Sequence, residues 1–398
     1  MSVQGAIQQH DRAVAPSLRA LLLGFDPGLA LAAIGLAICS LVAVGAATAD
    51  DIAGDPGYFV QRQAAYFVAG GFVAVLLWRT DYSRLRDFKY LIYGALIASL
   101  LAVRVLGDVA RGSRRAIDLP FFSFQASELG KILLVVALAA FAADRARYVH
   151  DRRTTARIVL LGMIPVALVM LQPDLGSALV SIAVTFAILL FAGTPWRHFA
   201  ALTALGLAAI ALALAVMPAA GVNVLHDYQK ERLTAFLYPS DTSSDEGYQQ
   251  NQSRIAIGAG EKTGRGDQAS QTKLNFLPEH HTDFVFAVVG ERWGFAGAAL
   301  VLSLYSLLIW RALRILTVAK NLFGALIAGG IVAMMLFQIF VNVGMTIGIM
   351  PITGIPLPLM SYGGSSILST MIAIGLLQSI YAQGRSAAAS KGRVLTFQ

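Results

Sequence analysis

The chain has 398 residues, of which 57% are hydrophobic and only 14% are charged, and its mean hydropathy is +0.66. Soluble globular proteins carry about 25% charged residues, and a water-soluble fold could not hide this much apolar surface, so we expect a polytopic membrane protein. The formal net charge of +8 would suit nucleic-acid binding, but the bases gather at the ends of apolar runs, so we expect no nucleic-acid partner. The single cysteine, Cys39, excludes an internal disulfide.

Ten apolar runs approach the length of about 20 residues that a helix needs to span a bilayer. They cover residues 28–48, 60–78, 89–105, 128–143, 158–171, 175–192, 199–218, 284–310, 323–347 and 364–382. The first run ends in small residues, as a signal peptide does, but it is longer than the apolar region of about 7–15 residues in such peptides. We therefore interpret it as an uncleaved first transmembrane helix.

The positive charges set the predicted orientation, because loops rich in Lys and Arg stay on the cytoplasmic side. Bases follow spans two, four, six and eight, and all of these fall on one side if the turn at Pro173 is external. The sequence thus predicts an all-α polytopic membrane protein of about ten transmembrane helices with both termini cytoplasmic. Its predicted parts are a cytoplasmic segment at 1–27, a transmembrane domain at 28–382 and a cytoplasmic tail at 383–398, with a large extracytoplasmic loop at 219–283 between helices 7 and 8.

Two basic stretches lie on the predicted outer side, at 104–125 and within the loop at 219–283. Long loops escape the positive-inside rule, so the predicted topology is unaffected. Most of these bases are expected to be solvated loop residues. The alternative is that they attract an anionic substrate to the outer face.

Three polar features lie at membrane depth or at its edge. Glu128 and Lys131 are three residues apart and share one helix face, either as a buried ion pair or as charges lining a substrate cavity. Asp174, in "LQPDLGSAL", is best explained as the N-cap of a helix. The stretch "GIMPITGIPLPLMSYGGSS" cannot be helical throughout, and its apolar residues favour a re-entrant loop over a plain external one.

Glycine pairs occur at two further places. "GERWG" (290–294) and "GMTIG" (344–348) are small-xxx-small patterns. We expect close helix packing at both.

The stretch "LPEHHTDF" gathers four ionisable residues where the eighth span begins. Glu279, His280, His281 and Asp283 are candidate metal ligands, although adjacent histidines point in different directions and disfavour a closed site. Asp283 is alternatively a helix cap, or a general base whose pKa partial desolvation would raise. The residues alone leave the last two interpretations open.

Taken together, these segments resemble the SEDS family (shape, elongation, division and sporulation), and their residues are closer to those of RodA than to those of FtsW. The matching segments are "FQASELGKILLV", "LQPDLGSAL", "GYQQNQSRIAIGAG", "LNFLPEHHTDFVFAVVGERWGF" and "MPITGIPLPLMSYGGSS". They occur in the family's order and cover most of the chain from about Gly112. Two departures affect loop paths: Ala126 replaces a usual proline, and "GAGEKTGRGDQAS" replaces a glycine-rich segment.

The resemblance implies a peptidoglycan glycosyltransferase of the bacterial cytoplasmic membrane that polymerises lipid II on the outer face. The family's essential acid corresponds to Asp283, which we expect to act as the general base. We expect a class B penicillin-binding protein and other elongation-complex proteins as partners, besides membrane lipids. The resemblance implies no tightly bound cofactor, with a divalent cation (Mg²⁺ or Mn²⁺) as a possible helper. Candidates for binding the pyrophosphate or lining the cavity are Arg114, Arg115, Glu128, Lys131, Arg254, Glu279, His281 and Ser361.

Three other functions are weighed against this one. A lipid II flippase would also use broken helices and membrane-embedded charges, but the sequence has no inverted repeat and its polar residues concentrate on one side. A scaffold would only anchor a partner enzyme, and the cluster around Asp283 would then be packing. The third is the division-specific polymerase of the FtsW type.

Overall fold

The computed structural model describes residues 24–49, 52, 55–110, 113–119, 122–212, 245–269, 271 and 276–395. Within them, a helix lies on every predicted span. These are α3 (Pro27–Thr48), α4 (Tyr58–Arg79), α5 (Lys89–Leu106), α6 (Ala126–Asp144), α7 (Arg152–Met170), α8 (Leu175–Phe191), α9 (Trp196–Ala211), α14 (Val285–Val318), α15 (Leu322–Thr346) and α16 (Gly364–Leu395). By length and composition, eight of them can cross a membrane, while α8 is shorter at 17 residues and α9 spans 16 described residues.

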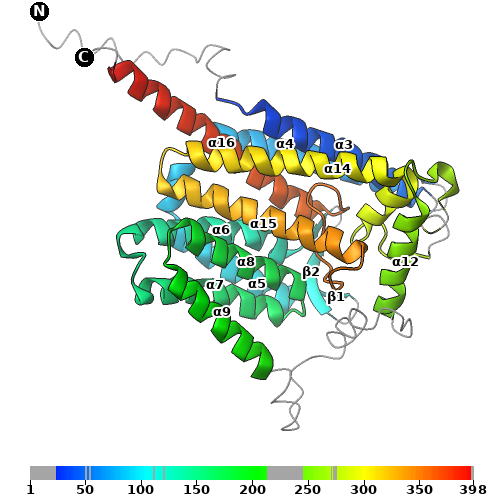
Figure 1. Ribbon diagram of the computed structural model, residues 1–398, viewed down its shortest axis with the longest axis horizontal. Coiled ribbons are helices and arrows are strands. Elements are labelled where there is room, and N and C mark those ends of the chain that lie inside the picture. The colour runs from blue at the N-terminus through cyan, green and yellow to red at the C-terminus, as the bar shows by residue number, and fades with distance from the viewer. Residues whose placement is uncertain are drawn as a thin grey trace, which may run out of the picture.

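The helices lie roughly along one axis and form a layered bundle (Figure 1). α3 packs on α14 and α4 packs on α16, whereas α5, α7 and α9 lie on the opposite side of the bundle. α6 lies between these layers, and 83% of the residues in its apolar stretch are buried within the protein. By contrast, α4 exposes Val68 and Phe72 by 75% and 65%, as a lipid-facing helix does.

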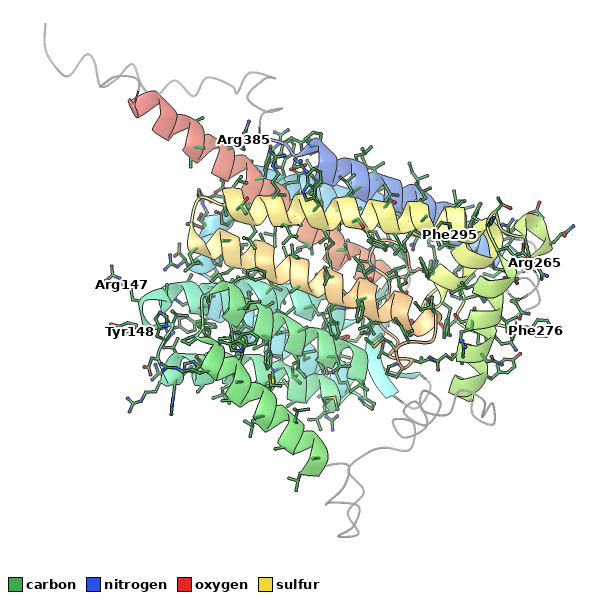
Figure 2. The ribbon with its side chains drawn as sticks, viewed as in Figure 1. Arg147, Tyr148, Arg265, Phe276, Phe295 and Arg385 are labelled. Carbon is green, nitrogen blue, oxygen red and sulfur yellow. The ribbon has the colours of Figure 1, made fainter. Side chains whose placement is uncertain are left out.

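The two ends of the bundle carry different elements. α3 begins and α16 ends at one end, and the strands and α12 (Asp245–Ala259) lie at the other. Figure 2 shows Arg147 and Arg385 at the first end and Arg265 at the second. Both termini of the helical domain therefore face one side, and the assignment of that side to the cytoplasm stays a prediction.

An ion pair holds three helices together at the first end. Asp26 is fully buried and its Oδ1 accepts a hydrogen bond from Arg311 Nε at 2.9 Å. The backbone N–H of Asp26 donates to Gln378 Oε1, also at 2.9 Å. These bonds join α3, α14 and α16. The last of these helices continues unbroken past residue 383, where the sequence predicted a separate tail.

The fold is helical as predicted, with the addition of a small sheet between α5 and α6. β1 (Asp108–Ala110), β2 (Ser113–Leu119) and β3 (Phe122–Phe124) pair antiparallel in that order, with Ile117 opposite Phe124. Along β3, Ser123 is exposed between two half-buried phenylalanines. That two-residue alternation is typical of a half-buried strand, but it is too short to stand out against the neighbouring apolar spans.

The predicted outer loop at 219–283 contains α12. This helix packs against α14 and is tied to the end of α15, where Ser253 Oγ donates to the carbonyl oxygen of Thr346 at 2.9 Å. Gln250 Nε2 donates to the carbonyl oxygen of Met350 at the same distance. Residues 213–244 of the predicted loop and of the seventh span lie outside the described part of the chain.

The first glycine pair meets the prediction at one position and departs from it at the other. A Cβ atom at Gly290 would lie 3.0 Å from Ile257 Cγ1 and 3.4 Å from Ile257 Cα in α12, so this glycine allows the close helix packing that was predicted. Gly294 interrupts α14 with φ 62° and ψ −155°, a conformation almost restricted to glycine. A Cβ atom there would lie 2.5 Å from the backbone nitrogen of Gly264, so the close contact is with the 260–264 segment and not with another helix. Gly348 lies just beyond α15 with φ 85° and lets the chain turn.

Candidate functional site

A tight turn carries Asp283 to the start of α14. The backbone N–H groups of Thr282, Asp283 and Phe284 all point to the carbonyl oxygen of Glu279, at 3.2, 3.1 and 3.2 Å. The Glu279 carboxylate accepts a further hydrogen bond from Thr282 Oγ1 at 2.7 Å. Glu279 has φ 56°, which costs free energy for a non-glycine residue and is held by these bonds. Its side chain therefore shapes the turn that aims the half-buried Asp283.

The structure separates the two carboxylates for which the sequence suggested a capping role. α14 has Phe284 at its N-cap and no side-chain capping bond, so Asp283 does not cap this helix. Asp174 does cap α8, because its Oδ1 accepts a hydrogen bond from the backbone nitrogen of Ser177 at 3.0 Å, as predicted.

The two adjacent histidines face different neighbours. His280 is 5% exposed, and its Nδ1 lies 2.9 Å from the carbonyl oxygen of Leu277. The half-buried His281 ring lies 5.0 Å from that of Phe59, and the two imidazole planes make an angle of 75°. In the described part of the chain, no three His, Cys, Asp or Glu side chains gather as a metal ion requires.

The loop at 347–363, which joins α15 to α16, covers Asp283. Gly354 has φ 69°, and a Cβ atom there would lie 3.5 Å from Asp283 Oδ2. Asn342 of α15 is fully buried and its amide nitrogen donates twice: to the carbonyl oxygen of Asp283 at 2.9 Å and to that of Ile355 at 2.8 Å. One side chain thus holds the turn with Asp283 against the loop that faces it.

The loop is also fastened at its far end. Ser361 Oγ donates to the carbonyl oxygen of Thr282 at 2.6 Å and accepts from the backbone nitrogen of Leu357 at 2.8 Å. Ser361 is 1% exposed, and Ile355, Leu357 and Leu359 are equally buried. Irregular backbone at membrane depth is tolerated when protein covers it, and the burial of these residues agrees with the predicted re-entrant loop.

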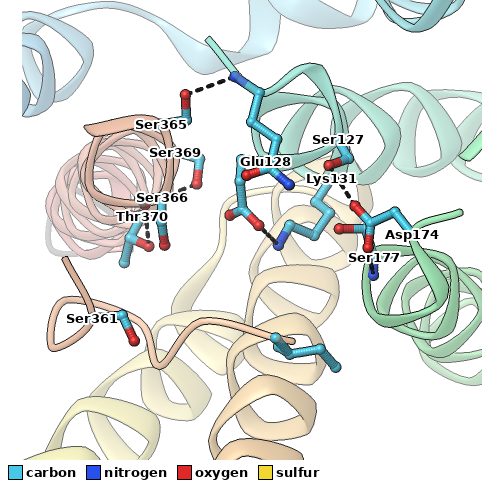
Figure 3. A network of polar contacts seen from close by, with 12 residues as sticks. Ser127, Glu128, Lys131, Asp174, Ser177, Ser361, Ser365, Ser366, Ser369 and Thr370 are labelled. Carbon is cyan, nitrogen blue, oxygen red and sulfur yellow. Dashed lines mark hydrogen bonds and ion pairs between the residues drawn. The ribbon is translucent and has the colours of Figure 1, made fainter. Parts of the chain in front are cut away.

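A second polar cluster lies between α6, α8 and α16 (Figure 3). Lys131 Nζ is 2.7 Å from Glu128 Oε1, and each side chain is 2% exposed. Ser127 Oγ donates to Asp174 Oδ2 at 2.9 Å. Figure 3 shows a row of hydroxyl side chains across from the ion pair, on α16: Ser365, Ser366, Ser369 and Thr370.

The cluster contains an unsatisfied charged atom. Glu128 Oε2 is buried and has no hydrogen-bond partner among the described residues. A buried carboxylate oxygen without a partner costs free energy, which a purely structural ion pair would not need to carry. The structure thus shows the buried ion pair of the first sequence interpretation, and its role in a substrate cavity stays a prediction.

The 347–363 loop connects the two polar regions. A Cβ atom at Gly176, in the first turn of α8, would lie 2.8 Å from the carbonyl oxygen of Thr353 and 2.7 Å from Ile355 Cγ1. Asp174, two residues earlier, contacts Ser127 beside Glu128. The same loop residues flank Gly354, which faces Asp283. The loop that faces Asp283 therefore also packs against the start of α8, whose N-cap Asp174 is bonded to Ser127.

The sequence profile of the FtsW, RodA and SpoVE family, described as cell cycle proteins, matches residues 27–386. The chain belongs to this family. The match runs from the start of α3 into α16 and includes both polar regions of the site.

Its relatives in the family carry several names. The chain is 38% identical over 365 residues to a probable peptidoglycan glycosyltransferase FtsW of Thioalkalivibrio sulfidiphilus, with 89% of each protein covered. It is 33% identical over 357 residues to the peptidoglycan glycosyltransferase MrdB of Escherichia coli, covering 89% of the chain and 93% of that protein. Because FtsW and MrdB names both occur, the coarser family assignment is the one that these relatives support.

Solved structures of family members share the fold. A chain from a peptidoglycan synthase complex aligns with a TM-score of 0.76 at 32% identity, covering 90% of this chain and 98% of that one. The rod shape determining protein RodA of Thermus thermophilus aligns with a TM-score of 0.66 at 31% identity, covering 90% and 96%. The eight candidate spans and this family together identify a multi-pass membrane protein of the bacterial inner membrane.

The remaining predicted site residues belong to α12 and to β2, at the end of the bundle opposite the start of α3 and the end of α16. Arg254 is exposed on α12, and its aliphatic stem lies beside Gly348 at the base of the 347–363 loop. Arg114 and Arg115 belong to β2, but their side chains lie outside the described part of the structure.

Sequence reasoning missed two buried residues that hold the Asp283 turn or the loop that faces it. Asn342 is one, and its position inside an apolar span was a usable signal, because polar groups in spans are costly and often functional. Gln63 is the other: it is fully buried in α4, and its amide contacts Ser361 and Gly363. No local pattern connects α4 to a loop about 300 residues away.

Proposed function

We propose that this chain is a peptidoglycan glycosyltransferase that polymerises lipid II on the outer face of the bacterial cytoplasmic membrane during cell elongation. Its relatives include proteins named peptidoglycan glycosyltransferase, and about nine tenths of the chain aligns with them. The observation that carries the proposal is the double hydrogen bond of Asn342, which holds the Asp283 turn against the re-entrant loop. The assignment to elongation rests on the RodA-like amino-acid sequence of the "LNFLPEHHTDF" and "PITGIPLP" segments.

In this proposal Asp283 is the general base. It takes the proton from the GlcNAc 4-hydroxyl of one lipid-linked sugar, and that oxygen attacks the anomeric carbon of the other. Undecaprenyl pyrophosphate leaves as the glycosidic bond forms. A positioned base contributes about 10²–10⁴-fold to the rate, and the held geometry of two bound substrates supplies much of the rest.

The departing pyrophosphate is anionic and needs cations nearby. Arg254 is exposed, so it is our first candidate for direct contact, together with Arg114 and Arg115 of the outer hairpin. Lys131 is buried in its pair with Glu128, so we assign it a longer-range effect through the low-dielectric interior. His281, at the edge of the turn, is a candidate sugar contact.

A divalent cation does not find a complete protein site in the described residues, and no step is assigned to one. Mg²⁺ is usually held by one or two carboxylates plus substrate phosphates. A Mg²⁺ or Mn²⁺ helper would therefore be held largely by the lipid pyrophosphate, with Asp283 as the nearest acidic side chain of the turn.

We further propose a class B penicillin-binding protein and other elongation proteins as partners. One structural neighbour belongs to a peptidoglycan synthase complex described as coordinating polymerization and crosslinking. That pairing of activities supports a transpeptidase partner for this chain.

The test is glycan polymerisation from purified lipid II by the full-length protein, resolved on gels, with and without the partner. Asp283→Asn keeps the size of the side chain and removes its basicity, so we expect polymer to fall at least about a hundredfold. Glu279→Gln keeps an acceptor for the Thr282 hydroxyl, so we expect a milder loss. Normal polymer from the Asp283→Asn protein would refute the catalytic role. If purified wild type moves lipid II across liposome membranes but makes no polymer, the transporter alternative replaces the proposal.

A further inference from the structure

A group of aromatic side chains lies beside the Asp283 turn and has no part in the mechanism above. We call Phe59, Tyr66, Phe122 and Tyr362 the aromatic wall. The ring of Tyr362 lies 5.1 Å from that of Phe59 and 6.3 Å from that of Tyr66, and the rings of Tyr66 and Phe122 are also 6.3 Å apart. The four rings come from α4, β3 and the 347–363 loop, so only the tertiary fold brings them together.

The wall faces the protein interior and not the lipid. Phe59 and Tyr66 are seven residues apart on α4, and Gln63 and Gly70, which share this helix face, are its two buried residues. Phe72, on another face of the same helix, is 65% exposed. The wall is therefore distinct from the aromatic belts that face lipid headgroups at membrane surfaces.

Although they face inward, the rings of the wall are only half-buried. Core aromatic residues of this protein are covered far more completely: Phe284 is 1% exposed and Tyr305 is 2% exposed. The rings of the wall therefore keep accessible surface that the protein does not cover, on a different face of α4 from the exposed Phe72. Large apolar surface at such a place is typical of a ligand site.

Tyr362 is rigidly placed next to the catalytic turn. Its backbone nitrogen donates to the carbonyl oxygen of His281 at 2.9 Å. Gln63 contacts the chain on both sides of it, at the carbonyl oxygen of Ser361 (3.1 Å) and the backbone nitrogen of Gly363 (3.4 Å). Asp283 follows His281 by two residues, so their Cα atoms are at most about 7.6 Å apart.

The wall also has polar edges. Burial, together with the neighbouring Tyr66, raises the pKa of Tyr362 to about 12, and Arg62 acts in the opposite direction. The Tyr362 hydroxyl thus stays protonated at neutral pH and lies among the polar groups of Tyr66 and Arg62. A surface with flat apolar faces and hydroxyl and guanidinium groups at its rim matches a pyranose ring, which has C–H groups on its faces and hydroxyls around its edge.

We propose that the aromatic wall, centred on Tyr362, is the subsite on which a sugar ring of the lipid-linked substrate stacks while its hydroxyl is presented to Asp283. This inference rests on the proposed function for the identity of the substrate. The stacked ring buries its C–H face in the ground state and in the transition state alike. Loss of the wall therefore weakens substrate binding and raises KM more than it lowers kcat.

The test measures binding without turnover, in the full-length Asp283→Asn protein in detergent. The ligands are lipid II and undecaprenyl pyrophosphate, which share the lipid and the pyrophosphate but differ in the sugars. We expect Tyr362→Leu to raise the Kd for lipid II about tenfold and to leave that for undecaprenyl pyrophosphate unchanged. Tyr362→Phe keeps the ring, so we expect its Kd for lipid II to stay close to that of the parent protein. Phe72→Leu, an aromatic loss on the lipid side of α4, serves as the matched control.

Each outcome decides the matter. An unchanged Kd for lipid II in both Tyr362→Leu and Tyr66→Leu makes the wall mere packing. Equal weakening of both ligands shows that the wall acts on the lipid or the pyrophosphate and also overturns the inference. If Tyr362→Leu does not fold, Tyr66→Leu carries the test. Because no turnover is needed, a loss of binding that depends on the sugars upholds the subsite even if wild type makes no polymer. If the wall variants leave the Kd for lipid II unchanged while wild type polymerises normally, the subsite is refuted and the proposed function is not.

Discussion

Replacing Asn342 by leucine should separate the placement of Asp283 from the stability of the fold. Leucine has nearly the same shape as asparagine, so the substitution leaves little cavity, but it removes both hydrogen bonds of the buried amide. The carbonyl oxygens of Asp283 and Ile355 then lose the donor that holds the Asp283 turn to the loop. We expect the two segments to separate by a fraction of an ångström to an ångström.

The expected effect on stability is moderate. Two carbonyl oxygens that are left without a donor cost about 1–3 kcal/mol each. Against this, Asn342 Oδ1 is itself buried with no partner among the described residues, and its removal relieves a penalty of about 1–3 kcal/mol. About half of the cost is therefore offset. Activity has no such compensation, because a misplacement of about 1 Å can lower the rate about a hundredfold.

The assay is initial-rate polymerisation of lipid II together with thermal unfolding in the same detergent. Ser379→Ala is the matched control, since it removes a buried 2.7 Å hydrogen bond to the carbonyl oxygen of Thr80 at the opposite end of the bundle. We expect Asn342→Leu to retain its unfolding temperature within a few degrees and to lose about two orders of magnitude in kcat, while the control keeps its kcat. Wild-type kcat in Asn342→Leu would refute the reasoning, as would a loss of activity that is fully matched by unfolding.

Two further predictions concern the ion pair in α6 and the break in α14. Lys131→Met leaves Glu128 buried without a counter-charge and should lower the free energy of unfolding by about 3–5 kcal/mol. Adding Glu128→Gln to this variant should restore most of the stability but not the polymerisation. A double variant with full activity would show that the pair only holds the helices together. Gly294→Ala forces a side chain into a conformation reserved for glycine, 2.5 Å from the Gly264 backbone, and should cost about 1–3 kcal/mol or more in thermal unfolding. Gly206→Ala, in the helical α9 with no atom within 4 Å of the new Cβ, should be neutral or slightly stabilising, and an equal effect at both glycines would contradict the assigned role of Gly294.

The spans were predictable because membrane insertion is encoded locally. A run of about 20 apolar residues must satisfy its own backbone hydrogen bonds, and only a helix does so within one segment. Each predicted run therefore became a helix, including α8, whose N-cap Asp174 was also readable from its neighbours. Asp283 was singled out by family resemblance, since periodicity and spacing left its role as cap or base open.

The site itself depends on contacts between residues far apart in the sequence, which no local pattern specifies. Gln63 meets a loop 298 residues later, and Ser361 meets the Thr282 carbonyl over 79 residues. Only the packed bundle decides that Asp174 caps a helix whereas Asp283 does not. It also decides that Gly294 lies against the backbone of the 260–264 segment and not against a helix. The sequence by itself determined which segments enter the membrane and which acid the family resemblance singles out, because these follow from hydrophobic length and motif. The tertiary structure decided what holds that acid in place and which rings stand beside it, because side-chain hydrogen bonds and close backbone contacts form only after the helices have packed.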